Sequence, residues 1–185
     1  VAVVLFEDGE GLPQAKTWLD EVRESGEFGG KSGEMATLHQ PQGLKAKRLI
    51  AVGCGKKGKF DAAVLRKAVG TVVRSVKQKG VKKLAWMLHD DTIAEAAVEG
   101  AILGNYEPNM NKPSSDTKPL ESFALVAGAK STALDAALAR AVILAESQNF
   151  ARDLGNQPAN LMTPTIIAQE AQKIAKEFGL DIEVL

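Results

Sequence analysis

Short apolar runs alternate with helical stripes along this chain, and this alternation restricts the fold more than any other sequence feature. Four runs bounded by glycine, charged or turn residues have the character of buried strands: residues 3–6, 49–52, 84–88 and 123–127. Stripes of apolar residues at helical spacing separate the last three runs. An alternating order of strands and helices needs parallel crossovers, so the sequence predicts an α/β fold.

The ends of the predicted helices carry recognisable signals. Asp61 is the expected N-cap of the first helix, which runs to Gly80. The second helix follows Asp91 and Thr92 and is expected to end at Gly104. These two helices would supply the crossovers of the sheet.

Two further helices are predicted after a loop-like, proline-rich stretch at 106–119. The first has Thr132 and Asp135 as a weak capping-box variant and ends where Gly155 follows Leu154. In the second, Thr163 is the expected N-cap, followed by proline at the first helical position. Beyond it, residues 180–185 alternate like a new strand, which would begin another unit of strand and helix.

Composition excludes several classes of protein. The single cysteine, Cys54, excludes an internal disulfide framework and a cysteine-cluster zinc site, and it fits a reducing compartment. No apolar run approaches the ~18–20 residues that span a bilayer. The first ten residues resemble a strand more than a signal peptide, so we expect an intracellular, cytoplasmic protein. The missing initiator methionine and the abrupt last residue lead us to expect a piece of a longer protein.

The basic residues are concentrated in the middle of the chain, although 23 basic and 23 acidic side chains balance overall. Residues 42–83 contain thirteen basic residues and one acidic residue. Such a segment fits a binding surface for nucleic acid or another polyanion. It equally fits a solvated helix face whose charge is balanced by acidic segments or by another subunit. Few aromatic side chains lie among the lysines, and base stacking on a nucleic acid would need them.

A glycine-rich segment at 53–60, GCGKKGKF, matches two phosphate-binding patterns. Three of its glycines fit the dinucleotide fingerprint, but the following helix opens with Asp61, whose charge opposes a pyrophosphate. It also fits the phosphate loop of nucleotide hydrolases, but Phe60 replaces the hydroxyl that would hold magnesium. We therefore interpret it as a glycine turn after a buried strand, with Gly58→Val destabilising the fold if that turn needs a positive φ at Gly58.

No complete catalytic or metal-binding arrangement is evident. His39 and His89 are the only histidines, and neither has a second histidine four residues away. Asp90 and Asp91 follow a predicted strand, where α/β ligand sites occur, but they also suit the cap of the next helix. Cys54 lacks a nearby histidine, and no serine lies in a nucleophile elbow. We predict no catalytic, cofactor-binding or metal-binding residue in this span.

Residues 149–185 resemble the junction between the two domains of the leucyl aminopeptidase family, also called cytosol aminopeptidases. The matching positions are Ala151, Arg152, Asp153, Leu154, Asn156, Pro158, Asn160, Thr163 and Pro164. Similar upstream segments are FGGKSGE at 28–34, KRLIAVGCGKK at 47–57, LRKAVG at 65–70 and EGAILGNY at 99–106. The sequence departs from the family at EPNMNKP, residues 107–113, where an aromatic and basic stretch is common.

The resemblance implies a three-layer, macro-like α/β domain with a mixed, largely parallel sheet at 1–129. It also implies a connector helix at 130–155 and the start of a peptidase domain at 156–185. Enzymes of this family remove N-terminal amino acids, leucine among them, from peptides. They use two divalent metal ions, Zn²⁺ or Mn²⁺, that bridge the attacking water or hydroxide. The family's catalytic motifs are absent from this sequence, so we expect the span itself to be inactive.

The resemblance also implies a homo-oligomer, hexameric at full length, in which this span supports assembly. A second hypothesis is nucleic-acid binding through 42–83, because some family members also bind DNA. A macro-like fold further raises ADP-ribose or nucleotide binding, but a fold by itself does not establish a function. We expect peptide substrates for the complete protein and no membrane partner.

Overall fold

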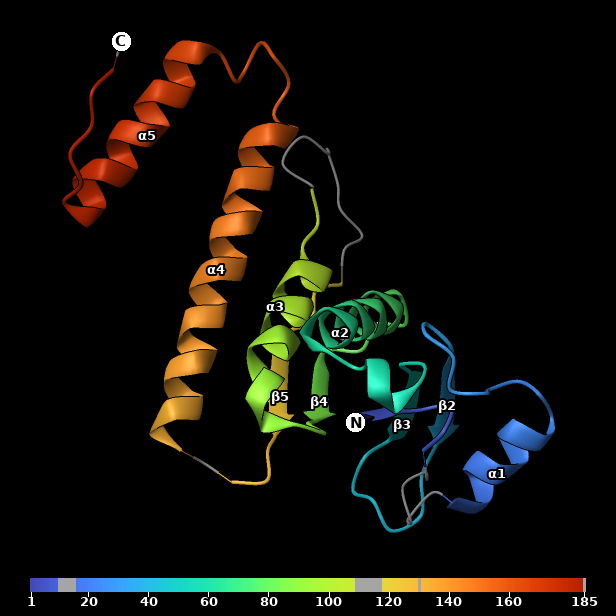
Figure 1. The fold of residues 1–185 in the computed structure, drawn as a ribbon. Helices are drawn as coiled ribbons and strands as arrows, with labels where there is room; N and C mark the ends of the chain where they lie inside the picture. The colour runs from blue at the N-terminus through green and yellow to red at the C-terminus, as the bar shows by residue number, and fades with distance from the viewer. Residues whose placement is uncertain (10–15, 109–117, 130, 185) are drawn as a thin grey trace.

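A five-stranded sheet is the centre of the structure, a computed structural model that describes residues 1–9, 16–108, 118–129 and 131–184 (Figure 1). Its strand order is β2–β3–β1–β4–β5. The strands are β1 (Ala2–Leu5), β2 (Met35–His39), β3 (Arg48–Gly53), β4 (Lys83–Met87) and β5 (Ser122–Val126). All neighbouring strands are parallel except β2, which pairs antiparallel with β3. The prediction of a mixed, largely parallel α/β sheet is confirmed.

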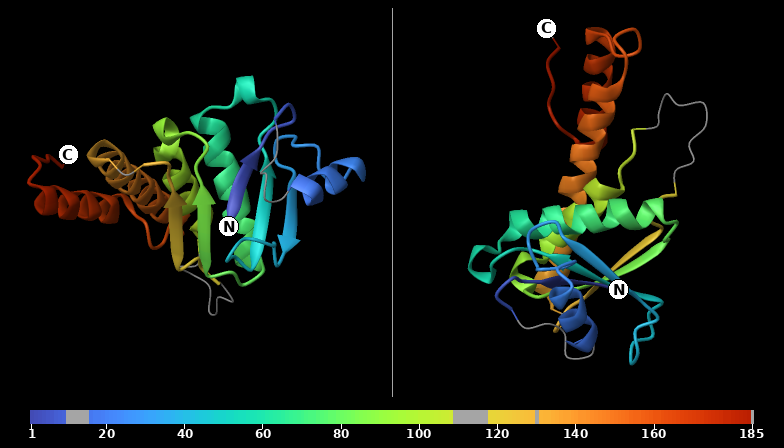
Figure 2. Two further views of the ribbon diagram at one scale, coloured as in Figure 1. Left: turned by 90° about the horizontal axis from the view of Figure 1, so that it is seen from below. Right: turned by 90° about the vertical axis from the view of Figure 1, so that its right-hand side faces the viewer.

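Helices cover both faces of this sheet and form three layers. The helices are α1 (Lys16–Glu24), α2 (Ala62–Gln78), α3 (Ala94–Asn105), α4 (Thr132–Asn156) and α5 (Pro164–Phe178), with short 3₁₀ turns η2 (Lys57–Lys59) and η3 (Asp91–Ile93). Helices α2 and α3 lie on one face and α1 on the other, while α4 lies outside α3 (Figure 1). Helix α4 extends beyond the sheet, and α5 lies at its far end (Figure 2). Among the described helices, none has the length and apolarity needed to cross a membrane.

The central strand β1 contributes side chains to two hydrophobic cores, one on each face of the sheet. Ala2 and Val4 face the larger core beneath α2 and α3, in which Trp86 of β4 is fully buried. Val3 and Leu5 face the smaller core beneath α1, where they meet Leu19 and Phe28. Successive side chains of a strand point to opposite faces, so a fully apolar strand must be covered on both sides.

Glycines allow α2 and α3 to pack closely. A Cβ atom at Gly100 would lie 2.5 Å from the backbone oxygen of Arg66, and one at Gly104 would lie 2.8 Å from the Cα of Gly70. The expectation that Gly104 ends its helix is therefore wrong, because α3 continues to Asn105. Gly104 allows α3 to pack closely against α2 and is not a C-cap residue.

Several helix ends match the predicted signals. The Asp61 side chain accepts a hydrogen bond from the backbone N–H of Val64, and Thr163 caps α5 in the same way. The predicted start of α4 is wrong by one residue, because Ser131 provides the cap and Thr132 lies inside the helix. The predicted end is also short, because α4 includes Gly155 and continues to Asn156. One helical glycine near a C-terminus costs too little to stop a helix of this length.

Helix α1 and strand β2 were not predicted from the sequence, and the strand predicted at 180–185 is wrong over the described residues 180–184. Helix α1 contains few apolar residues, and β2 is an edge strand whose residues are only partly buried. Residues 180–184 form no strand among the described residues. An alternating sequence becomes a strand only when another strand supplies hydrogen-bond partners.

Candidate functional site

The glycine-rich segment is a structural turn at the carboxyl end of β3. The backbone N–H of Gly55 donates to the carbonyl oxygen of Gly30 at 2.9 Å. A Cβ atom at Gly53 would lie 2.2 Å from the backbone oxygen of Lys31, so that glycine admits a neighbouring loop. Gly55 has a φ of +75°, whereas Gly58 has no positive φ and nothing within 4 Å of an added Cβ. The interpretation as a turn is confirmed, but Gly55 is the residue that needs conformational freedom.

The carboxyl edge of the sheet carries an aromatic cluster next to this turn. The Phe6 ring lies 5.1 Å from the rings of both Phe60 and His89, in edge-to-face geometry. This arrangement places the aromatic side chains at the end of β1. His39 is exposed at the end of β2, away from His89. Among the described residues, no group of three or more His, Cys, Asp and Glu side chains could hold a metal ion.

Asp90 is a capping residue. Its carboxylate accepts hydrogen bonds from the backbone N–H and the hydroxyl of Thr92, at 2.8 and 2.7 Å. These bonds favour the charged form and hold the pKa of Asp90 below its ordinary value. Asp90, Asp91 and His89 also line an open hollow of about 450 Å³ that reaches Gly128. The capping interpretation is confirmed for Asp90.

Cys54 is buried in the larger core, behind the glycine turn. Burial disfavours the thiolate and raises the pKa of Cys54 to about 12. A thiol in this state is a poor nucleophile, so the structure gives Cys54 a packing role.

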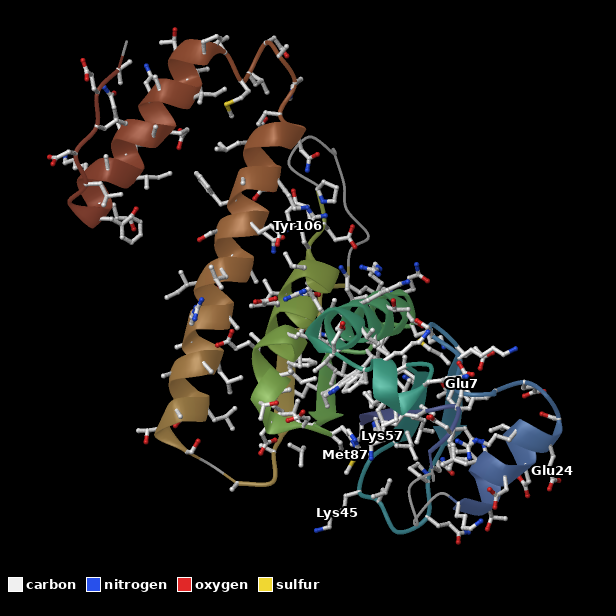
Figure 3. All side chains as sticks on the ribbon, viewed as in Figure 1. Glu7, Glu24, Lys45, Lys57, Met87 and Tyr106 are labelled. Carbon is white, nitrogen blue, oxygen red and sulfur yellow. The ribbon has the colours of Figure 1, made fainter. Side chains whose placement is uncertain are left out.

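The fold divides the basic segment 42–83 among three places. Lys45, Lys47 and Arg48 lead into β3, and Lys79, Lys82 and Lys83 lead into β4, so these six residues lie at the amino edge of the sheet. Lys56, Lys57 and Lys59 lie at the opposite edge, after β3. Figure 3 labels one residue of each group, Lys45 and Lys57. Those on α2 include Arg66 and Lys77, which pair with Glu99 and Glu107. The thirteen charges therefore do not form one surface.

A hollow of about 710 Å³ lies at the amino edge of the sheet. Its rim includes Lys47, Arg48, Lys79 and Lys83, and apolar residues of the strands line it further in. Lys82 also lines it and pairs with Glu121 at 2.6 Å, which raises the pKa of Lys82. This edge is the most basic part of the middle segment.

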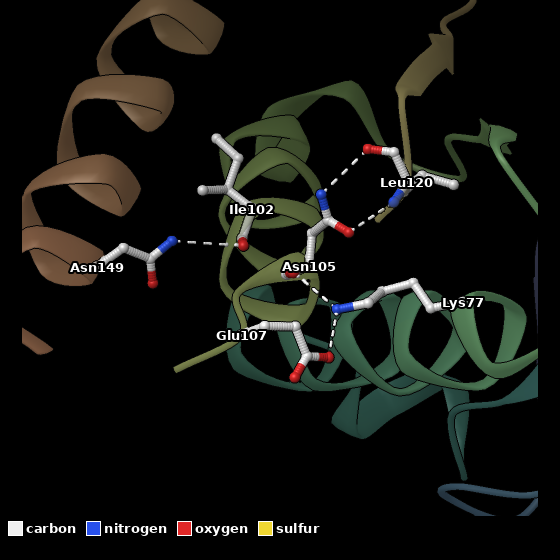
Figure 4. Close-up of polar contacts among 6 residues, drawn as sticks. All are labelled: Lys77, Ile102, Asn105, Glu107, Leu120 and Asn149. Atoms are coloured by element: carbon white, nitrogen blue, oxygen red, sulfur yellow. Dashed lines mark hydrogen bonds and ion pairs between the residues drawn. The ribbon is translucent and has the colours of Figure 1, made fainter. Parts of the chain in front are cut away.

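The junction after α3 contains a group of connected polar contacts. The buried ammonium of Lys77 donates to the carbonyl oxygen of Asn105 and to the carboxylate of Glu107, both at 2.7 Å (Figure 4). The Asn105 side chain accepts from the N–H of Leu120 at 2.8 Å and donates to its carbonyl oxygen at 3.1 Å. These contacts join the ends of α2 and α3 to the start of β5.

Tyr106 connects this junction to the last turn of α4. Its hydroxyl donates to the carboxylate of Asp153 at 2.6 Å and accepts from the side-chain amide of Asn156 at 2.9 Å. The guanidinium of Arg152 lies over the ring, 4.2 Å from the centroid. The bond to Asp153 is the main reason that the pKa of Tyr106 is raised. Sequence reasoning missed this cluster; the only available signal was the grouping of polar residues at both helix ends.

Large apolar side chains remain exposed on α4, on α5, in the segment that joins the two helices and in the segment after α5. They are Ile143, Leu144, Phe150, Leu161, Ile167, Phe178, Leu180, Ile182 and Val184. Exposed apolar side chains in such number mark a surface suited to contact with other protein.

The sequence profile described as "Cytosol aminopeptidase family, N-terminal domain" matches residues 3–114. The chain belongs to the cytosol aminopeptidase family. A probable cytosol aminopeptidase of Solibacter usitatus is 48% identical over 180 residues, which cover 95% of this chain and 37% of the relative. One of Koribacter versatilis is 38% identical, with coverage of 86% and 36%. This cytosol aminopeptidase chain thus spans little more than a third of these relatives.

Solved structures show the same fold. A tomato leucine aminopeptidase mutant superposes with a TM-score of 0.81 at 22% identity, covering 96% of this chain and 39% of that one. The bottromycin maturation enzyme BotP, in complex with Mn, superposes with a TM-score of 0.76 at 26% identity, covering 97% and 36%. The similarity therefore includes α4 and α5 as well as the sheet.

Proposed function

We propose that this cytosol aminopeptidase chain is the N-terminal portion of a cytoplasmic enzyme that removes N-terminal amino acids from peptides by two-metal hydrolysis. The observation that carries the proposal is the match of residues 3–114 to the family's N-terminal domain. The names of the relatives and the Mn complex of the structural neighbour support it. The two metal ions, Zn²⁺ or Mn²⁺, would lie in the catalytic domain, outside this span.

In this proposal, residues 1–185 supply no catalytic or metal-binding side chain. The described residues contain no cluster suited to a metal ion, and Cys54 is buried with a raised pKa. We assign residues 1–129 to the macro-like domain, 130–155 to the connector and 156–185 to the start of the catalytic domain. The sheet and the connector helix would then serve as support.

The test is an assay of the purified chain with leucyl-p-nitroanilide and added MnCl₂, together with calorimetric titration of Mn²⁺. We expect neither hydrolysis nor stoichiometric Mn²⁺ binding, while a full-length cytosol aminopeptidase hydrolyses the same substrate. Hydrolysis that co-elutes with the 19.6 kDa chain and disappears with a chelator would overturn the assignment.

We further propose that the span supports homo-oligomer assembly, hexameric in the full-length enzyme. The exposed Ile143 and Leu144 on the outer part of α4 support this role. Sedimentation velocity of the chain should show association that increases with concentration. A chain that stays monomeric at its highest soluble concentration would contradict an assembly role for the span by itself.

Nucleic-acid binding is a second candidate, favoured by the gathering of basic side chains at the amino edge of the sheet. If all six neutralise phosphates of duplex DNA, the slope of log affinity against log salt is about −5. Charge reversal of Lys79 and Lys83 should flatten that slope, whereas reversal of Lys56 and Lys59 at the other edge should not. Absence of binding at low salt would remove this candidate.

A further inference from the structure

Helix α4 packs against α3 with few fully buried side chains. Among its described side chains, only Ala141 and Ala145 are buried, and each contributes a single methyl group. Larger side chains such as Ile143 and Leu144 are exposed, at 65% and 47%. Leu134, Leu138, Val142 and Leu154 are only half-buried, so contacts other than apolar packing also help to position α4.

Those other contacts lie toward the carboxyl end of α4. Positions 141, 145, 149 and 153 recur every fourth residue, so they share the face of the helix that meets α3. The two alanines of this face are followed by the polar residues Asn149 and Asp153. The side-chain amide of Asn149 lies 3.5 Å from the carbonyl oxygen of Ile102. Only at Asp153 does a short contact form, with the Tyr106 hydroxyl at 2.6 Å. The last turn is therefore the most firmly attached part of this face.

The backbone next to Tyr106 is itself fixed to the sheet domain. Asn105 binds both backbone groups of Leu120, which precedes β5, and its carbonyl oxygen accepts from the buried Lys77. The neighbouring Glu107 completes the pairing of that ammonium. A side chain held between two such anchors has little freedom to follow a moving helix.

We propose that Tyr106 is a positioning residue that fixes the direction in which the chain leaves α4. Its hydroxyl holds two side chains of the last turn, Asp153 and Asn156, and its ring packs under the guanidinium of Arg152. Residues 157–163 and α5 then start from a defined place relative to the sheet. The inference rests on the proposed function only in that the positioned segment leads into the catalytic domain.

Tyr106→Phe tests this role because it removes the hydroxyl and keeps the ring beneath Arg152. Loss of a charge-assisted hydrogen bond should raise the amide-exchange rates of residues 150–156 by about tenfold or more. Exchange in α2 and the strands should not change. Ser147→Ala is the matched control, since it removes an exposed hydroxyl from the same helix. Asp153→Asn keeps an acceptor and should have a smaller effect.

A distance measurement separates positioning from stability. Spin labels on cysteines introduced at the exposed Lys67 and Ala159 report how the end of α4 lies relative to α2. The native Cys54 will not be labelled, because it is buried and its pKa is about 12. We expect a narrow distance distribution that broadens in Tyr106→Phe and stays narrow in Ser147→Ala.

The proposal is overturned if the distance distribution of Tyr106→Phe matches that of the unsubstituted protein. It is also overturned if exchange rises equally in α2 and the strands, because Tyr106 would then stabilise the whole domain. Neither result depends on peptide hydrolysis or on a metal ion. Failure of the positioning role and failure of the proposed enzymatic function can therefore be told apart.

Discussion

Replacing Gly100 with alanine should destabilise the protein, although the same change stabilises most helices. A helical Gly→Ala substitution ordinarily gains about 0.8–1 kcal/mol from backbone entropy. Here the new methyl group would lie 2.5 Å from the backbone oxygen of Arg66 and 3.0 Å from Val69. Backbone cannot rotate away, so α2 and α3 must separate, and overpacking of this kind costs about 1–3 kcal/mol. Because the 2.5 Å contact is with backbone, we take the upper part of this range, about 2–3 kcal/mol, and expect a net loss of about 1–2 kcal/mol.

Differential scanning calorimetry measures this loss directly. In a chain of this size, 1 kcal/mol corresponds to about 2–4 °C, so the Tm should fall by about 2–8 °C. Gly155→Ala is the control, because Gly155 is also helical but has nothing within 4 Å of an added Cβ. Its Tm should stay level or rise. A Gly100→Ala protein that melts at or above the temperature of the original would refute the close-packing argument.

Three other predictions concern the loops at the carboxyl edge of the sheet. Gly55→Ala should cost about 1–2 kcal/mol in urea unfolding, because its φ is +75°, whereas Gly58→Ala should have little effect; equal midpoints would contradict this. Cys54 should not react with Ellman's reagent at pH 8 until the protein unfolds, because its pKa is about 12; stoichiometric labelling of folded protein would exclude that burial. The lowered pKa of Asp90 adds stability above its ordinary value of 3.8, and this stability is lost as pH falls through the lowered value. Asp90→Asn should therefore reduce the stability difference between neutral and acidic pH in chemical denaturation, and an unchanged pH profile would refute it.

The elements predictable from sequence are those whose local signals and burial agree. Helix α2 has an aspartate cap at Asp61, a continuous apolar stripe and a glycine at residue 80, and each signal indicates the same boundaries. The buried strands are apolar on both faces because helices cover the sheet on both sides. A segment can be predicted from sequence when its propensity, its apolar pattern and its tertiary structure agree.

The features that escaped prediction depend on partners distant in sequence. Strand β2 gains its hydrogen bonds from β3, and a weakly apolar edge strand has little pattern of its own. The contact between Tyr106 and Asp153 joins residues 47 positions apart, and neither residue type predicts the other. The strand predicted after α5 failed for the same reason, since alternation by itself supplies no neighbouring strand. The expectation that this span contains no catalytic residue stays a prediction.

The double hydrogen bond between Asn105 and Leu120 has a consequence for protein engineering. It joins positions 15 residues apart by contacts that do not involve the residues between them. The entropy of closing a loop grows only with the logarithm of its length, so doubling the length costs about 0.6 kcal/mol. A peptide epitope inserted after the exposed Lys118, inside the closed segment, should therefore lower the free energy of unfolding by less than about 1 kcal/mol in urea titration. At this position the protein can accept foreign sequence while its sheet stays intact.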